Sequence, residues 1–145
     1  MKKLTALLLV VMLMLFSVGC YILNQSPSKL VELEQYSAMT IDGTTSIEVV
    51  YDYIEGEFNT YEFVIEDQET IVNIMTEIFK LELEDYPDDQ DMDIYQRWII
   101  VKQGNNRYHI DLTLVSDGEK MYICQSQGVR DIIETYIDDN LNGDE

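Results

Sequence analysis

Hydrophobic and polar residues alternate along two neighbouring stretches in the first half of the chain. In residues 46–54 the apolar positions include Ile47, Val49 and Tyr51, and after a break at Gly56 the alternation resumes over residues 58–66. Alternation with period two, carried by β-branched and aromatic residues, is typical of strands with one buried face. The two stretches therefore predict a β-hairpin.

The hydrophobic spacing then changes to that of a helix, and the same spacing returns near the end of the chain. Apolar residues separated by three and four positions form one stripe along a helix, which must be buried against another element. Asp67 precedes the first stripe and is well placed as an N-cap, and Ser126 or Gln127 opens the second helix. The stripes consist of Ile71, Ile74, Met75, Ile78 and Phe79, and of Val129, Ile132, Ile133, Tyr136 and Ile137.

Three further strands are predicted between these helices, over residues 98–102, 107–115 and 120–125. Turn signals separate them, at Gly104-Asn105-Asn106 and at Asp117-Gly118. The expected order is strand, strand, helix, three strands, helix. This order predicts an α+β fold, with an antiparallel sheet of about five strands and two helices on one face.

The first twenty residues have the pattern of an export signal. Lys2 and Lys3 form a positive head, an apolar run follows, and Gly19 stands directly before Cys20. The segment resembles the lipobox signal of bacterial lipoproteins, and this resemblance implies cleavage before Cys20 and acylation of its sulfur. The alternative is an uncleaved membrane-spanning helix, because residues 4–23 are also long enough to cross a bilayer.

The expected domain organisation follows from these segments. Residues 1–19 are the signal peptide, 20–45 the lipidated cysteine and a tether, 46–140 one α+β domain and 141–145 an acidic tail. Within the tether, residues 30–39 are expected to be coil or a short helix. Residues 40–140 also resemble small uncharacterised lipoproteins of Gram-positive bacteria, through the Ile47-x-Val49 strand, the acidic cap and the closing strands and helix. That family implies no activity.

Charge excludes one class of partner. The chain has 28 acidic and nine basic residues, and two of the nine, Lys2 and Lys3, lie in the signal. Nucleic-acid binding requires clustered Lys and Arg to neutralise phosphates. We therefore expect no nucleic-acid partner.

The most acidic stretch, residues 82–93, has part of the pattern of a calcium site. Asp89, Asp91 and Asp93 have the spacing of the first ligands of an EF-hand, but Ile94 and Ile100 stand where that loop needs Gly and Glu. A looser, weak metal site remains an alternative to a solvated acidic connector. Its candidate ligands are Asp85, Asp88, Asp89, Asp91 and Asp93.

The sequence offers little for catalysis. Cys124 lies in an apolar run and is expected to be buried, and His109 is expected on the exposed side of its strand. No phosphate-binding loop, nucleophile motif or set of His and Cys metal ligands is present in the sequence. We expect no cofactor and no enzymatic activity.

These expectations favour a non-catalytic binding module on the outer face of a cell membrane. Its contacts would be the membrane, through the lipid on Cys20, and an envelope protein or peptide. The binding surface is expected on the uncovered sheet face, with candidate contacts from Tyr51, Tyr53, Tyr61, Tyr108 or Tyr122. The alternative is a cation-binding protein or a cell-envelope hydrolase that uses the acidic residues 82–93.

Overall fold

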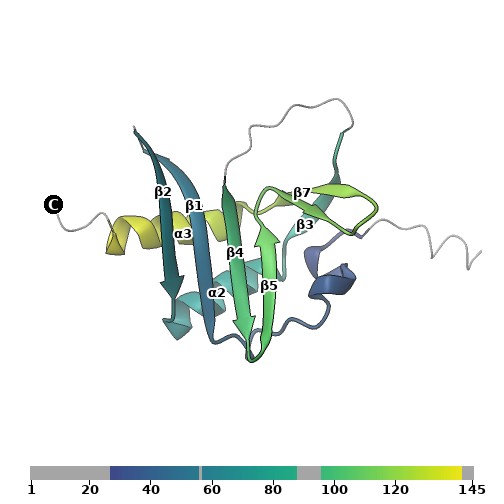
Figure 1. Ribbon diagram of the computed structural model, residues 1–145, viewed down its shortest axis with the longest axis horizontal. Coiled ribbons are helices and arrows are strands. Elements are labelled where there is room, and N and C mark those ends of the chain that lie inside the picture. Colours follow the sequence, from purple (N-terminus) through teal and green to yellow (C-terminus); the bar gives the residue numbers. More distant parts are fainter. Residues whose placement is uncertain (1–26, 56, 88–95, 142–145) are drawn as a thin grey trace, which may run out of the picture.

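The computed structural model describes residues 27–55, 57–87 and 96–141, with the backbone alone at 54, 55, 57 and 58. The chain folds into two antiparallel sheets and two α-helices, preceded by two short 3₁₀ helices (Figure 1). The elements are η1 (Leu30–Glu32), η2 (Glu34–Tyr36), β1 (Ser46–Glu55), β2 (Glu57–Ile65), α2 (Gln68–Ile78), β3 (Glu82–Asp85), β4 (Arg97–Gln103), β5 (Asn106–Asp111), β6 (Leu114–Ser116), β7 (Met121–Gln125) and α3 (Gln127–Asn140).

The strands form a large sheet with the order β2-β1-β4-β5 and a small sheet with the order β3-β7-β6. Both helices lie behind the large sheet in Figure 1, so they cover one of its faces. The predicted α+β class and the two helices on one face are confirmed. The strand count differs, because the described residues form seven strands in two sheets instead of about five in one.

The predicted strand over residues 107–115 divides between the two sheets. β5 pairs with β4, whereas β6 pairs with β7. The Asp111 carboxylate accepts hydrogen bonds from the backbone N–H groups of Thr113 at 2.7 Å and Leu114 at 3.0 Å. A side chain that bonds the backbone two and three residues ahead competes with the strand ladder, so β5 ends at this turn.

One additional strand, β3, comes from the acidic segment that was expected to be a connector. β3 pairs with β7 in an antiparallel register that places Leu83 opposite Cys124. Leu83 is the one buried residue of β3, and Glu82, Glu84 and Asp85 are exposed. The small sheet therefore gains a strand from a sequence with only one apolar position.

The predicted β1–β2 hairpin and both helices are present. Asp67 caps α2, since its carboxylate accepts a hydrogen bond from the Thr70 N–H at 2.8 Å. Ser126 stands at the N-cap of α3, but its hydroxyl donates to the Leu112 carbonyl instead of capping the helix. The apolar stripes of both helices join one core with the covered face of the large sheet.

The segment before β1 belongs to the folded unit. Leu30, Leu33, Tyr36 and Met39 are buried in the common core, and the Tyr36 hydroxyl donates to the His109 carbonyl at 2.7 Å. This segment contains the two short 3₁₀ helices, in keeping with the coil or short helix predicted for residues 30–39. The part of the expected tether from residue 28 onward is therefore packed against the sheets.

Candidate functional site

The large sheet has one face that the two helices do not cover, which we call the open face. The strand register defines it, because residues directly opposite each other on neighbouring strands share a face. Val50 lies opposite Glu62 and Trp98, and Ile100 lies opposite Glu48 and His109. The open face thus includes Glu48, Val50, Glu62, Val64, Trp98, Ile100, Lys102, Arg107 and His109.

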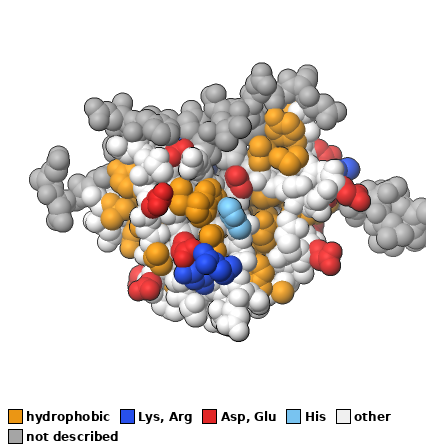
Figure 2. Space-filling view, in the orientation of Figure 1, with side chains coloured by type: hydrophobic (Ala, Val, Ile, Leu, Met, Phe, Trp, Pro, Cys, Tyr) orange, Lys and Arg blue, Asp and Glu red, His pale blue; other side chains and the backbone are white. Residues whose placement is uncertain are grey.

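An apolar patch occupies the centre of this face. Trp98 and Ile100 are half-buried, Val50 is buried, and Val64 is 48% exposed on β2. The Trp98 ring packs against the exposed His109, with ring centroids 4.9 Å apart and an interplanar angle of 55°. Figure 2 views this face, where hydrophobic side chains lie on both sides of the pale-blue histidine and charged side chains lie above and below it.

Charged side chains border the apolar patch. Glu48 forms ion pairs with Lys102 and with Arg107, whose Nη2 lies 2.6 Å from Oε2 of Glu48. The hydrogen bond from Lys102 and the charge of Arg107 lower the pKa of Glu48. The two cations lie beside each other on β4 and β5, as the register pairs Lys102 with Arg107.

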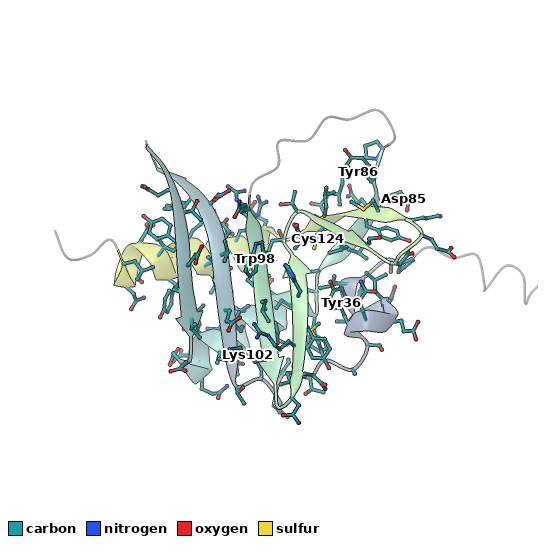
Figure 3. The ribbon with its side chains drawn as sticks, viewed as in Figure 1. Tyr36, Asp85, Tyr86, Trp98, Lys102 and Cys124 are labelled. Carbon is teal, nitrogen blue, oxygen red and sulfur yellow. The ribbon has the colours of Figure 1, made fainter. Side chains whose placement is uncertain are left out.

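A buried carboxylate fixes the end of β4 that leads into Trp98. Asp52 is only 4% exposed, and it accepts hydrogen bonds from the Thr60 hydroxyl at 2.7 Å and from the Gln96 N–H at 2.6 Å. The Arg97 side chain donates to the Asp52 carbonyl at 3.1 Å. These bonds join β1 to β2 and to the start of β4, so the backbone that leads into Trp98 is held against β1. Figure 3 shows Trp98 and Lys102 along β4.

The tyrosines expected on this surface have other positions. Tyr51 and Tyr53 point toward α3, where their hydroxyls donate to Glu134 and Asp138. Burial raises the pKa of Tyr51, and its hydrogen bond to Glu134 adds to this shift. Tyr61 lies opposite Tyr51 in the register and therefore shares its face.

The remaining two tyrosines, Tyr108 and Tyr122, are buried. None of the five candidate tyrosines lies on the open face, so the expectation that they present contacts there is wrong. The shared face of Trp98, Ile100 and Lys102 was predictable from the sequence, because these residues occupy alternate positions of one strand.

The proposed metal ligands lie mostly outside the described residues. Asp88, Asp89, Asp91 and Asp93 are in the undescribed stretch 88–95, and Asp85 is exposed at the end of β3. Over residues 27–55, 57–87 and 96–141, no group of three or more His, Cys, Asp or Glu side chains is placed to hold a metal ion.

Cys124 and His109, the two residues considered for chemistry, are not brought together. Cys124 is a free thiol, 6% exposed and directed into the core from β7, whereas His109 is exposed on the open face. Burial raises the pKa of the Cys124 thiol to about 12, so the reactive thiolate is suppressed near neutral pH. The prediction that Cys124 is buried is confirmed.

Three of the cavities lined by described residues lie away from the open face. The largest, about 770 Å³, is bordered by η1, η2 and the β6–β7 turn and is lined by Glu32, Glu34, Asp117 and Glu119 among others. A second, about 530 Å³, lies between α2 and α3, and a third, about 420 Å³, lies beside Asp85 and Tyr86. Acidic side chains line all three cavities. The second also contains Tyr136, and the third contains Tyr86 and Lys120.

Comparisons with known protein families, with curated proteins and with solved structures found no match to this chain. Cys20 lies outside the described residues. Among the helices of the described part, none has the length and apolarity needed to cross a membrane.

Proposed function

We propose that this protein is a non-catalytic binding module attached to the outer face of a cell membrane through a lipid on Cys20. Its partner is an envelope protein or peptide, which it contacts through the open face of the large sheet. The observation that carries the proposal is Trp98, a half-buried tryptophan at the centre of an apolar patch bordered by an ion-paired cluster.

This arrangement has the composition of a protein interface. Tryptophan and arginine are enriched where binding energy concentrates, and apolar centres are typically surrounded by polar rims. On the open face Trp98 supplies the aromatic contact, while Glu48, Lys102 and Arg107 supply the polar rim. The helices lie on the other side of the sheet, so they leave this patch accessible.

Replacing Trp98 tests the binding surface. In intact envelopes that carry the anchored full-length protein, chemical cross-linking should trap a partner with the native chain. Trp98→Ala should weaken that association by about thirtyfold, corresponding to about 2 kcal/mol for a residue that dominates an interface. The cross-linked yield, quantified by mass spectrometry, is the measurement.

Val72→Ala is the matched control for this experiment. Val72 is an exposed apolar residue, 41% accessible, but it lies on α2 and away from the open face. Thermal unfolding of each variant separates lost binding from lost folding. Equal cross-linking of the Trp98 and Val72 variants to the same partner would contradict a role for the open face.

Replacing Cys20 tests the anchor. Cys20→Ser removes the sulfur that receives the lipid, so we expect loss of fatty-acid labelling and accumulation of the uncleaved precursor. Metabolic labelling with a fatty acid and the mass of the product are the measurements. A variant whose mass and membrane association match those of the native chain would instead support an uncleaved membrane-spanning helix.

A further inference from the structure

Among the residues that the structure describes, β2 is an edge of the large sheet to which no further strand is paired. β2 is nine residues long and forms the outermost strand, and it pairs with β1 without a bulge from Ile65 to Glu57. Natural edge strands are commonly protected by charged side chains, especially lysine, by proline, by bulges or by short length. β2 has the sequence Glu-Phe-Asn-Thr-Tyr-Glu-Phe-Val-Ile, so it lacks lysine, proline and a bulge, and its two charged residues are both glutamates.

The register shows which backbone groups point away from the sheet. The Asp52 N–H donates to the Gln96 carbonyl at 2.8 Å, so the even-numbered residues of β1 bond toward β4. In an antiparallel ladder successive residues bond to opposite sides, so the odd-numbered residues of β1 bond toward β2. Their partners on β2 are also odd-numbered, which leaves the N–H and C=O groups of Thr60, Glu62 and Val64 directed outward.

Apolar side chains flank this edge on both faces. Val64 is 48% exposed on the open face. On the covered face Tyr61 and Phe63 are half-buried, and Phe63 stacks on Tyr136 of α3 with ring centroids 5.3 Å apart and planes within 10°. In Figure 1 α3 crosses behind β2 and projects past it, so it extends under the place where a further strand would lie.

The charge along this edge is negative. β2 and the two residues that follow it contain Glu62, Glu66 and Asp67 and no Lys or Arg, and the last turn of α3 contains Asp138 and Asp139. The cavity between α2 and α3 continues this surface, because it is lined by Asp67, Asp131 and Asp139 together with Tyr136. A cationic segment is attracted to this edge, whereas an anionic one is repelled.

We propose that the β2 edge binds an extended, basic segment of a partner protein as an added strand. Outward backbone groups at Thr60, Glu62 and Val64 supply the main-chain hydrogen bonds. Alternate side chains of the segment would then be apolar against Tyr61 and Phe63, and Lys or Arg toward Glu62. This site lies at the edge of the sheet and shares Glu62 and Val64 with the open face, but it does not depend on Trp98.

A second copy of the chain is a less suitable occupant. Edge-to-edge pairing of two β2 strands would bring together two acidic edges, from chains that each carry a formal charge of −19. Repulsion between like charges opposes that pairing. Charge complementarity therefore selects a basic partner.

Amide hydrogen exchange on the full chain in a neutral detergent tests the proposal. The probe is a synthetic peptide of alternating Lys and Val, as long as β2, and the matched control peptide alternates Glu and Val. We expect the Lys peptide to slow exchange at the outward amides of Thr60, Glu62 and Val64 by about tenfold or more. The amides of Tyr61 and Phe63, already bonded to β1, should change little.

Two variants of the protein separate strand addition from simple charge attraction. Val64→Pro removes an outward N–H that β1 does not use, a position where an edge strand tolerates proline. It should weaken Lys-peptide binding by about tenfold, whereas Val64→Thr, which keeps the N–H, should bind like the native chain. Glu62→Lys should also weaken Lys-peptide binding, and it leaves the backbone unchanged.

The results of these experiments distinguish a basic partner segment from a second copy of the chain. Binding of the Lys peptide without protection of the three outward amides, or with equal affinity for the Pro and Thr variants, would overturn strand addition. Should Val64→Pro fail to fold, as judged by thermal unfolding, the protection pattern of the native chain and the Glu62→Lys variant still decide. Protection of the same amides that rises with protein concentration, without peptide, would show a second copy as the occupant and overturn the basic partner.

Discussion

Asp117 closes the β6–β7 hairpin through three hydrogen bonds. Its Oδ1 accepts from the N–H groups of Glu119 at 2.8 Å and Lys120 at 2.7 Å, and its Oδ2 accepts from the Tyr122 hydroxyl at 2.7 Å. These bonds favour the ionised carboxylate, and the one from Tyr122 is the largest cause. They lower the pKa of Asp117 to about 2 and raise that of Tyr122 to about 12.

This shift predicts a specific acid sensitivity. A carboxyl group whose pKa is lower in the folded state contributes stability above its ordinary pKa of 3.8, and that contribution is lost as the pH falls through about 2. Asp117→Asn should therefore lower the thermal midpoint at neutral pH and lose less stability than the native chain on acidification to about pH 2. Thermal unfolding monitored by circular dichroism across this range is the measurement. Parallel pH profiles for the two proteins would contradict the assignment.

At the scale of elements, α2 depends on its cap as well as on its apolar stripe. Both the Thr70 N–H and the Thr70 hydroxyl donate to Oδ2 of Asp67, at 2.8 and 2.6 Å. The carboxylate also lies at the positive end of the helix dipole. The cap fixes the point where the chain leaves β2 and turns into the helix.

Removing the cap should destabilise the fold without altering its core. We expect Asp67→Ala to lower the free energy of unfolding by about 0.5–2 kcal/mol, the usual effect of losing an N-cap. Asp67→Asn keeps a capping oxygen and should recover most of the loss. Urea denaturation gives both values, and equal stability of the Ala and Asn variants would show that the cap contributes little.

The elements also show where alternation in the sequence misleads. Residues 107–115 alternate throughout, yet the chain changes sheets at Leu112 and Thr113, because Asp111 bonds forward to the backbone. β3 gave no strand signal, because Leu83 is its only buried residue. β3 forms only by pairing with β7, which lies far along the chain, and a local pattern does not contain that contact. The β6–β7 pair is a hairpin between neighbouring segments, and the forward bonds of Asp111 decide where it begins.

At the scale of the whole molecule, the local patterns predict the α+β class, the first hairpin, both helices and Cys124 in the core. The extent of the folded unit was not predictable, because Leu30, Leu33 and Tyr36 are scattered among polar residues and acquire a buried role only against other elements. The sheet faces that the tyrosines occupy were not predictable for a related reason. Tyrosine has an apolar ring and a polar hydroxyl, so it occurs on either face of a sheet, and only the strand register decides which face it occupies.

The segment before β1 determines which end of the molecule lies next to the residues that precede the fold. The chain enters the described fold beside the small sheet, where the Leu83 N–H donates to the Ser28 carbonyl at 2.9 Å. In Figure 1 this entry point and the β2 edge lie at opposite ends of the molecule. In the proposed anchoring through Cys20, the chain would be held at the end of the fold where Pro27 lies, and the β2 edge would lie at the opposite end, accessible to a partner segment.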